Sequence, residues 1–317
     1  MSTSNPPEKA PLALIAGPTA SGKSDLAVQL AQRLEADGRR AVVLNADSAQ
    51  VYADLRILSA RPKVEDMGGI EHRLFGTWDG AQPCSAADWA KAAREDIATL
   101  HEQGAVPILV GGTGMYLRTL LEGIAPVPPI DPDIRAEVRA LDQGIAYEAL
   151  GQEDPHTAIR IAAADQARTM RALEVIRSTG RPLSEWQKQM SGGIGESVSL
   201  HPLILLPPRE WLYERCDRRF AAMLDEGAQQ EVSALLQRNL DPDLPVMRAI
   251  GVREIVGLIA GDSSAEEALA AGQQATRRYA KRQYTWFSHQ PPKEWLRVES
   301  DNYSNEDYFV SLLRKMG

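Results

Sequence analysis

Short apolar runs alternate with amphipathic stretches at the start of the chain. Residues 12–16, LALIA, are apolar throughout, and a glycine-rich segment follows them directly. In residues 24–38 leucines recur at helical spacing before Gly38, a residue type that commonly ends helices. Residues 41–47, AVVLNAD, form a second apolar run that ends at Asp47. This order of strand, loop, helix and strand predicts a βαβ unit and therefore a parallel sheet.

The alternation continues further along the chain. Residues 85–104 have the spacing of an amphipathic helix, with a serine at the start and a glycine at the end. Residues 106–117, VPILVGGTGMYL, indicate another buried strand followed by a glycine-rich turn. An apolar run returns at residues 201–208, HPLILLPP, and the remaining chain is mostly helical, with a long helix over residues 265–287.

Between these runs the pattern changes near Gly123. A proline-rich connector, GIAPVPPIDPDI, is followed by helical patterns without a convincing strand, up to a glycine-rich segment. We therefore predict an α/β core whose parallel sheet is flanked by helices. Residues 1–123 would form its first part, residues 124–197 a helical insertion domain, and residues 198–317 its second, mostly helical part.

The glycine-rich segment after the first strand, GPTASGKS, matches the phosphate-binding pattern GxxxxGK[ST]. Glycines let the backbone turn so that its N–H groups face an anion, and the N-terminus of the next helix adds positive potential. Lys23 adds a charge for the phosphate oxygens, and the hydroxyl of Ser24 is placed to bind Mg²⁺. We predict a P-loop NTPase-like core in which these residues contact phosphate: Gly17, Pro18, Thr19, Ala20, Ser21, Gly22, Lys23 and Ser24.

The loop is typical of ATP- and GTP-binding proteins, but it does not distinguish a nucleotide from another diphosphate. A nucleotide hydrolase normally carries a carboxylate at the end of a neighbouring strand, whereas the third predicted strand ends in VGGTG. Because ligands bind at the carboxyl ends of parallel strands, Asp47 is expected in the same crevice as Lys23. Its candidate roles are a helix cap, an indirect metal ligand or a general base.

Composition and charge limit the alternatives further. The two cysteines, Cys84 and Cys216, lie far apart and outside any Cys/His cluster, so neither a disulfide framework nor a zinc site is expected. The first ten residues indicate a loose polar tail, and the apolar run after them is too short for a signal peptide or a membrane span. We therefore expect a soluble cytoplasmic protein with no membrane partner. The net charge of −8 is not typical of nucleic-acid-binding proteins, although a local basic face can bind RNA.

Seven segments in order resemble the tRNA dimethylallyltransferase (isopentenyltransferase) family, over about residues 12–290. They are GPTASGKSDLA, NADSAQVYADLRI, PILVGGTGMYLRTLLEG, RALEVIRSTGRPLSEW, LYERCDRRFAAMLDEG, AIGVREI and RRYAKRQYTWF. The loop alone is shared by many families, but its combination with ADSAQVY and VGGTGMY is far more specific. Without zinc-finger cysteines before Gly317, the chain resembles the compact bacterial type.

The resemblance implies a particular reaction. The loop would bind the diphosphate of dimethylallyl diphosphate with no nucleotide required, and the five-carbon group would pass to the N6 amine of the adenine 3′-adjacent to the anticodon in tRNA. Asp47 would hold and deprotonate this amine, and Thr19 would lie near the bridging oxygen. Lys23 and a Mg²⁺ ion on Ser24 would stabilise the departing diphosphate. We also expect a monomer.

The adenine has to leave its stack in the tRNA anticodon stem-loop in order to react. The resemblance implies that four successive residues contact this base and its neighbours, with an amide at the last position that can pair with a base edge: Asp47, Ser48, Ala49 and Gln50. It also implies tRNA binding by the insertion domain and by single positions of the core. These tRNA contacts are Thr113, Arg135, Ala167, Arg168, Arg171, Arg248 and Arg253.

Two positions depart from the family pattern, because Ala167 stands where glutamine is usual and Val252 where tyrosine is usual. Arg168 and Arg171 share one helix face, where a solvated surface or an ion pair with Glu174 is the alternative to RNA contact. For four basic residues of the last helix, phosphate binding and pairing with acidic side chains are equally open: Arg277, Arg278, Lys281 and Arg282. Three aromatic residues of that helix are expected in the core: Tyr279, Trp286 and Phe287.

Two other functions fit the loop. A P-loop kinase that uses ATP on a small molecule would share the loop and a helical insertion, and it would be indifferent to tRNA. An RNA-binding P-loop module would use a nucleotide as a switch without chemistry on the base. The strand end without a carboxylate and the ordered series of family segments weigh against both.

Overall fold

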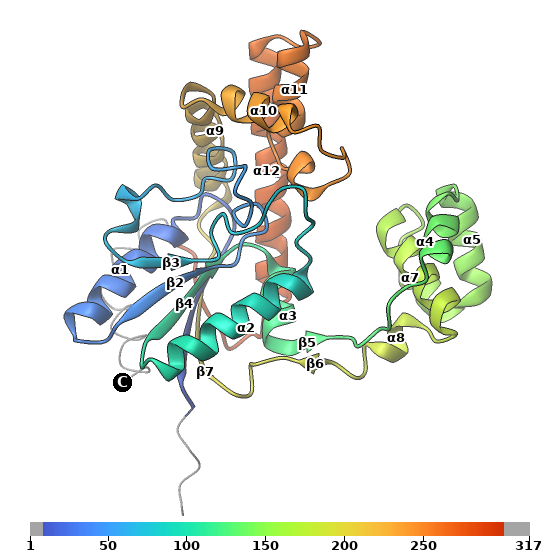
Figure 1. Ribbon diagram of the computed structural model, residues 1–317, viewed down its shortest axis with the longest axis horizontal. Coiled ribbons are helices and arrows are strands. Elements are labelled where there is room, and N and C mark those ends of the chain that lie inside the picture. The colour runs from blue at the N-terminus through green and yellow to red at the C-terminus, as the bar shows by residue number, and fades with distance from the viewer. Residues whose placement is uncertain (1–8, 301–317) are drawn as a thin grey trace, which may run out of the picture. The chain divides into compact units, whose positions relative to one another are not determined.

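The structure is a computed structural model that describes residues 9–300 (Figure 1). Its chain divides into two compact units, the core unit (Met1–Leu120 with Gly195–Gly317) and the insertion unit (Leu121–Ile194). The insertion domain expected at residues 124–197 begins and ends a few residues later than this unit. Most of the polar segment expected as a loose tail falls outside the described residues.

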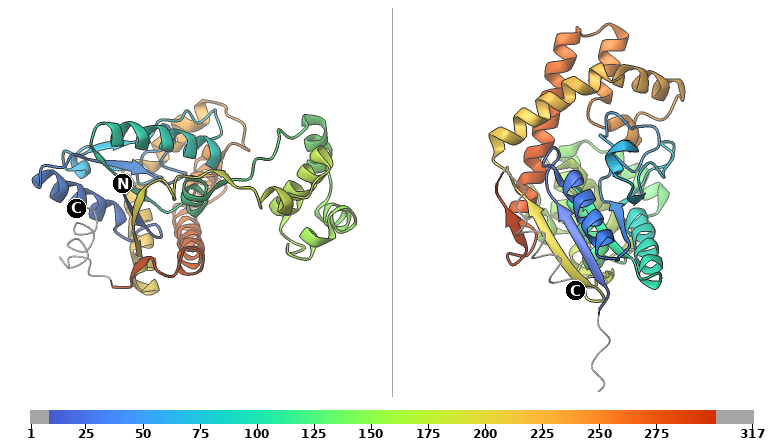
Figure 2. Two further views of the ribbon diagram at one scale, coloured as in Figure 1. Left: turned by 90° about the horizontal axis from the view of Figure 1, so that it is seen from below. Right: turned by 90° about the vertical axis from the view of Figure 1, so that its left-hand side faces the viewer.

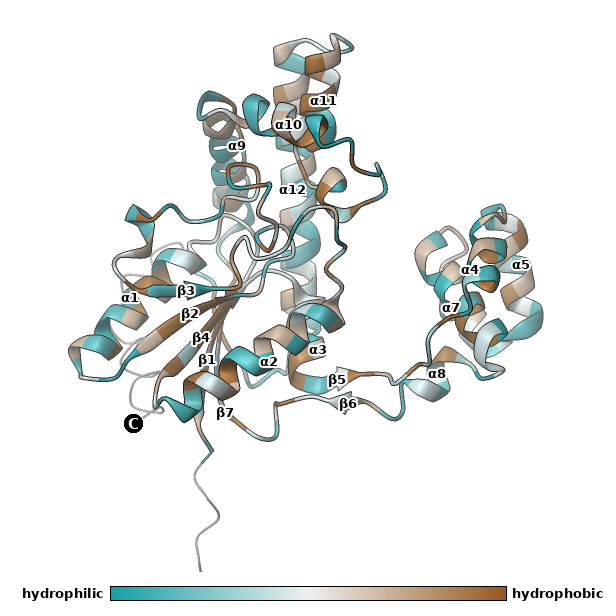
Figure 3. Cartoon of the chain, viewed as in Figure 1, coloured by the Kyte–Doolittle hydropathy of each residue, from teal (hydrophilic) through white to brown (hydrophobic). Residues whose placement is uncertain are grey.

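Among residues 9–300, six strands form the sheet of the core unit, in the order β3-β2-β4-β1-β7-β8, and every neighbouring pair is parallel (Figure 1). Their bounds are β1 (Pro11–Ala16), β2 (Ala41–Asn45), β3 (Glu71–Arg73), β4 (Val106–Gly111), β7 (Ser199–Leu205) and β8 (Leu296–Val298). The central strands are almost wholly buried, as expected when helices cover both faces, and Figure 3 shows them as hydrophobic. The prediction of an α/β fold with a parallel sheet is confirmed.

The hydrophobic pattern misses four short strands. β3 and β8 have three residues each and lie at the two edges of the sheet. β5 (Gly123–Ile124) and β6 (Ser191–Gly192) pair antiparallel in the insertion unit. The expectation of an insertion without a strand is therefore wrong for β6. Such short elements are held by backbone hydrogen bonds, so no apolar run marks them in the sequence.

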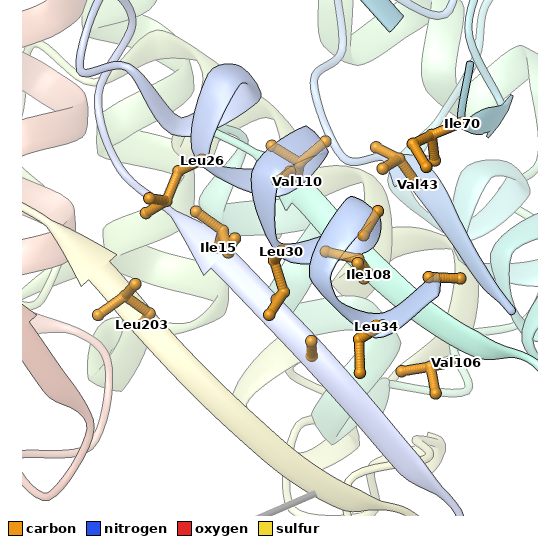
Figure 4. Close-up of a cluster of buried hydrophobic side chains, with 14 of the residues drawn as sticks. Ile15, Leu26, Leu30, Leu34, Val43, Ile70, Val106, Ile108, Val110 and Leu203 are labelled. Carbon is orange, nitrogen blue, oxygen red and sulfur yellow. The ribbon is translucent and has the colours of Figure 1, made fainter. Parts of the chain in front are cut away.

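Two helices lie on opposite faces of the sheet, α1 (Lys23–Ala36) and α2 (Ala86–Glu102) (Figure 2). The evenly spaced leucines of α1 pack against apolar side chains of the strands, among them Ile15 and Ile108 (Figure 4). Ser85 caps α2 as expected, because its hydroxyl accepts the N–H of Asp88 and the Asp88 carboxylate accepts the N–H of Ser85.

The core unit also contains α3 (Gly114–Glu122), α9 (Arg209–Asp225), α10 (Ala228–Gln237), α11 (Val252–Ala260) and α12 (Ala265–His289). Two 3₁₀ turns lie at η1 (Glu65–Met67) and η2 (Pro245–Arg248). α9 and α12 run side by side (Figures 1 and 2). The expected long helix is thus α12, which starts at a capping serine. Within residues 9–300, no helix combines the length and the apolar character needed to cross a membrane.

The insertion unit has its own small core. Its helices are α4 (Pro132–Arg139), α5 (Gln143–Glu153), α6 (Pro155–Ala158), α7 (Gln166–Thr179) and α8 (Leu183–Trp186). Val138, Leu150 and Leu173 are fully buried where α4, α5 and α7 meet. Asp131 caps α4 through its carboxylate, with Pro132 in the first turn.

Candidate active site

The phosphate-binding loop connects β1 to α1 at the carboxyl end of the sheet. A residue with a side chain could not replace Gly17, since a Cβ there would lie 2.6 Å from the carbonyl oxygen of Leu205. Gly22 adopts the left-handed conformation directly before α1, at φ 87°. Ala20 is also left-handed, at φ 64°, a conformation that non-glycine residues rarely adopt outside constrained sites. The loop thus has the curved backbone that a bound anion needs.

Two side chains of the loop, those of Lys23 and Ser21, have polar groups that could bind an anion. Burial, with a smaller contribution from the nearby Arg219, lowers the pKa of Lys23 to about 8, while the carboxylate of Asp47 opposes the shift. The ammonium of Lys23 donates to the carbonyl oxygen of Pro18 at 3.3 Å. The hydroxyl of Ser21 is buried without a hydrogen-bond partner within the described residues. A bound anion would stabilise the charged form of Lys23 and so reverse the effect of burial.

No pattern in the sequence singles out Arg219, yet α9 brings this residue to the loop. Its Nη2 donates to Oγ1 of Thr19 at 2.5 Å, and its Nε is buried without a partner within residues 9–300. From one turn earlier, Nε of Arg215 donates to the carbonyl oxygen of Ala20 at 2.9 Å. The segment LYERCDRRFAAMLDEG carried the family resemblance, but only the fold shows that α9 packs on the loop.

Gln283 of α12 fixes the loop to the end of β4. Its Oε1 accepts the backbone N–H of Thr19 at 2.7 Å, and its Nε2 donates to the carbonyl oxygen of Gly112 at 2.8 Å. A side chain at position 112 is disfavoured, because a Cβ there would lie 2.9 Å from the carbonyl oxygen of Gly17 and 2.3 Å from Nε2 of Gln283. The Gln283 side chain, which no local sequence pattern marks either, sets the position of Thr19.

Asp47 follows β2 and is 8% exposed. Its Oδ1 accepts the N–H of Ala49 at 3.0 Å, which orients the carboxylate. Oγ1 of Thr113, after β4, accepts the N–H of Ser48 at 2.9 Å. The two strand ends therefore hold each other, and the predicted convergence of Asp47 on the phosphate loop is present, since its charge acts on Lys23.

Tyr279 of α12 lines the same cavity as Asp47, so the expectation that it belongs to the core is wrong. Burial and the charge of Asp47 raise the pKa of the Tyr279 phenol, while Thr113 and Ser48 oppose this shift. Tyr279 therefore stays protonated beside the carboxylate. The helical period explains the difference, because the core residue of this turn is Ala280, which is fully buried.

The burial of Phe287 and Trp286 agrees better with the expectation that the aromatic residues of α12 lie in the core. Phe287 is fully buried. Trp286 is half-buried, forms an edge-to-face pair with Phe287, and occupies the space above Gly114, where a Cβ would lie 2.4 Å from its ring.

The cavity has a volume of about 270 Å³ and a polar end that contains Thr19, Arg219 and Asp47. Its apolar wall includes Leu58, Phe220, Met223, Ala249 and Ile250, and polar side chains such as Ser59, Arg248 and Arg282 also line the cavity. The arrangement can hold an anionic group at the loop, an apolar group beside it, and a proton donor against Asp47.

Several predicted contact residues lie at this cavity and others do not. Ser48, Ala49 and Arg248 line it, together with Arg282 of the basic stretch. Gln50 donates its Nε2 to the carbonyl oxygens of Ser59 and Ala60, at 3.0 Å each. Its amide nitrogen therefore folds the local loop and is not free to pair with a base edge.

The basic residues Arg277, Arg282 and Arg253 of the core unit lie in three different environments. Arg277 pairs with Asp217 at 2.5 Å, which is the structural alternative left open by the sequence. Arg282 stacks over the ring of Tyr279 at 5.6 Å. Arg253 is exposed on α11, whereas Val252 beside it is almost wholly buried.

In the insertion unit, one buried carboxylate gathers three arginines. Glu174 has a side chain only 5% exposed, and its oxygens lie 3.0 Å from Nε of Arg139, 3.7 Å from Nη1 of Arg171 and 4.0 Å from Nε of Arg135. The ion pair between Arg171 and Glu174 is thus present. The cluster keeps an excess of two positive charges, so pairing does not exclude anion binding. Arg168 pairs with Asp165 at 3.2 Å and is 77% exposed.

Magnesium fits this site only together with a phosphate ligand. Within the described residues, no group of three His, Cys, Asp or Glu side chains could hold a metal ion. Ser24 is exposed at the start of α1, where its hydroxyl is accessible to an ion on a bound diphosphate. Mg²⁺ commonly takes one or two protein ligands and completes its shell with phosphate oxygens and water, which agrees with this donor set.

Comparisons with known proteins identify close relatives. A family model described as IPP transferase matches residues 50–290. The tRNA dimethylallyltransferase of Erythrobacter litoralis is 64% identical over 97% of this chain and 97% of its own, and that of Novosphingobium aromaticivorans is 62% identical over 87% and 99%. The crystal structure of the full-length tRNA isopentenylpyrophosphate transferase from Bacillus halodurans is similar with a TM-score of 0.70 and 31% identity, over 97% of each chain. The structure of a eukaryotic dimethylallyltransferase acting on tRNA has a TM-score of 0.74 and 28% identity, over 88% of this chain and 70% of its own.

Proposed function

The chain belongs to the IPP transferase family, and from this premise we propose that it transfers the dimethylallyl group of dimethylallyl diphosphate to the N6 amine of the adenine 3′-adjacent to the anticodon in tRNA. One observation carries the proposal. Thr19 of the phosphate loop, Arg219 and the carboxylate of Asp47 line one cavity together with an apolar wall. The relatives do not favour an ATP-dependent small-molecule kinase.

In the proposed reaction, the N6 nitrogen attacks C1 of the prenyl group, and the bond from C1 to the bridging oxygen breaks. The electron pair of that bond leaves with diphosphate, whose growing negative charge is stabilised by Lys23, Arg219 and the N–H groups of the loop. Asp47 accepts the proton that the amine loses. The apolar wall keeps water from the allylic centre. A Mg²⁺ ion on Ser24 and the diphosphate would neutralise further charge.

The direct test is transfer of label from radioactive dimethylallyl diphosphate to unmodified tRNA in the presence of Mg²⁺. We expect labelled tRNA without any nucleotide added, and no ATP turnover in a control reaction. ATP consumption without labelled tRNA would refute the proposal in favour of a kinase.

The pKa of Lys23 leads to a pH-dependent affinity for dimethylallyl diphosphate in the absence of tRNA. In the free protein burial lowers the pKa of Lys23 to about 8, and a bound diphosphate raises it again. Below pH 8 the ammonium is already present, so affinity is maximal. Above pH 8 binding has to take up a proton, so affinity falls by about tenfold per pH unit. Calorimetric titrations from pH 7 to 10 measure the affinity for dimethylallyl diphosphate at each pH. Lys23→Arg, which stays charged, should give an affinity that does not change with pH. A pH-independent affinity in the wild-type protein would contradict the prediction.

The arginines of the insertion unit should bind RNA phosphates, by virtue of their charge. Arg139→Gln and Arg168→Gln are each expected to weaken tRNA binding and to reduce the slope of log affinity against log salt by about 0.7–0.9 for each phosphate that the variant no longer neutralises. Filter binding at several salt concentrations measures the slope. Arg177→Gln is the matched control on α7, because two carboxylates, Glu153 and Glu137, hold its guanidinium and its side chain is only 22% exposed, against 66% for Arg139. Unchanged slopes in the first two variants would refute phosphate binding by these arginines.

A further inference from the structure

The apolar wall of the cavity begins directly beside the anion-binding end. Arg219 contacts Thr19 of the loop, and the next residue of α9 is Phe220. Met223 follows Arg219 by about one helical turn. Phe220 and Met223 both line the cavity and are 2% and 8% exposed. A prenyl chain whose diphosphate lay at Arg219 would therefore run along the wall that these two side chains form.

The ring of Phe220 is held in a slot that two glycines create. On α12, a Cβ at Gly272 would lie 2.0 Å from Cζ of Phe220 and 2.1 Å from its Cε1. Before α11, a Cβ at Gly251 would lie 3.0 Å from Cε2 of the ring and 2.7 Å from Cδ2 of Leu58. Thr276, one turn after Gly272, also lines the cavity. The backbone at both glycines thus packs closely against the ring and limits how far it can withdraw from the cavity.

We propose that Phe220, held between Gly272 and Gly251, sets the length of the prenyl group by closing the apolar part of the cavity. The proposal rests on the proposed function. The reacting carbon has to lie between the loop and Asp47, so the rest of the chain extends toward the apolar wall. A five-carbon group ends at this wall, whereas a ten-carbon group has to pass the ring. Because the ring is backed by the main chain of α12 rather than by a flexible side chain, it excludes the longer group sterically.

The test compares geranyl diphosphate with dimethylallyl diphosphate as donors to the same tRNA. In Phe220→Leu, the ratio of kcat/KM for the ten-carbon donor to that for the five-carbon donor should rise by at least about tenfold, the scale of pocket-size discrimination. Phe220→Met is a second variant with the same expectation, since its unbranched side chain can turn out of the path. Phe287→Leu is the matched control, because it makes the same change at a fully buried ring of α12 that does not line the cavity.

A second substitution separates pocket length from general loosening of the fold. Adding Gly272→Ala to Phe220→Leu places a methyl group in the space where the ring atoms lie in the wild type. This double variant should return the donor ratio toward the wild-type value, which a merely loosened fold would not do.

Wild-type protein that uses both donors equally would overturn the proposal, as would an unchanged ratio in Phe220→Leu and Phe220→Met that still transfer the five-carbon group. An equal rise in Phe287→Leu would also overturn it. These outcomes leave the proposed function standing, because dimethylallyl transfer is retained in each. Wild-type protein that transfers neither group to tRNA would instead refute the proposed function, and this proposal with it.

Discussion

Asp47→Asn should lower the rate of dimethylallyl transfer to tRNA by about 10²–10⁴-fold, the usual contribution of a general base. Asparagine keeps the size of the side chain and an oxygen that can accept the N–H of Ala49, which Oδ1 of Asp47 accepts at 3.0 Å. It cannot accept the proton that N6 loses. The affinity for dimethylallyl diphosphate should change little, because the loop and Arg219 provide the anion contacts. Single-turnover transfer of label measures the chemical step, and calorimetry measures donor binding.

Asp25→Asn is the matched control for this prediction. Asp25 is an exposed carboxylate in the first turn of α1, two positions after Lys23, and it does not line the cavity. Its replacement should leave transfer within about twofold, as is usual for a surface position. A rate for Asp47→Asn equal to that of Asp25→Asn would show that the carboxylate does not act as the base. Loss of donor binding in Asp47→Asn would indicate an electrostatic role toward Lys23 instead.

The part of the site that the sequence predicts is the part made by local chemistry. The phosphate loop is a contiguous pattern whose glycines, lysine and serine have to occur at fixed spacing. Asp47 could be assigned to the same crevice because parallel strands end at one edge of the sheet. Neither inference needs knowledge of distant residues, and the core fold follows from the same runs of strand and helix.

Arg219 and Gln283 could not be found in this way, because they reach Thr19 from 200 and 264 positions away in the chain. Both lie on amphipathic helices, where an arginine or a glutamine is ordinary, and no local pattern shows which turn faces the loop. The prediction that Tyr279 lies in the core is wrong for a related reason, since the helical period fixes the buried face of a helix only to within about one residue. Short edge strands such as β3 are equally hidden.

The insertion unit illustrates a partial success. The spacing predicts that Arg168 and Arg171 share a face of α7, and it offers Glu174 as a partner on the same helix. The structure adds Arg135 and Arg139 from α4 to that carboxylate, which turns a single ion pair into a cluster with excess positive charge. Helical spacing describes one helix, whereas the cluster depends on how two helices pack.

Arg219→Gln should lower kcat/KM for dimethylallyl diphosphate by about 10²–10³-fold, the scale for loss of one donor that is aimed at a developing negative charge. Nη2 of Arg219 fixes the hydroxyl of Thr19, and its buried Nε has no partner within the described residues, so this donor is available to a diphosphate oxygen. Glutamine is too short to reach the loop and carries no charge. Steady-state transfer assays at saturating tRNA measure the effect, which should appear mainly in kcat because the charge grows as the bond breaks.

The neighbouring arginine makes a strict control, because Arg218 is exposed on the same turn of α9 and does not line the cavity. Arg218→Gln should retain transfer, so the change in net charge of the chain is separated from the effect at the site. Arg219→Lys should recover only part of the activity, since an ammonium restores the charge but not the planar fork that reaches Thr19 and the diphosphate together. Full activity in Arg219→Gln would mean that Lys23 and the loop N–H groups alone stabilise the leaving diphosphate.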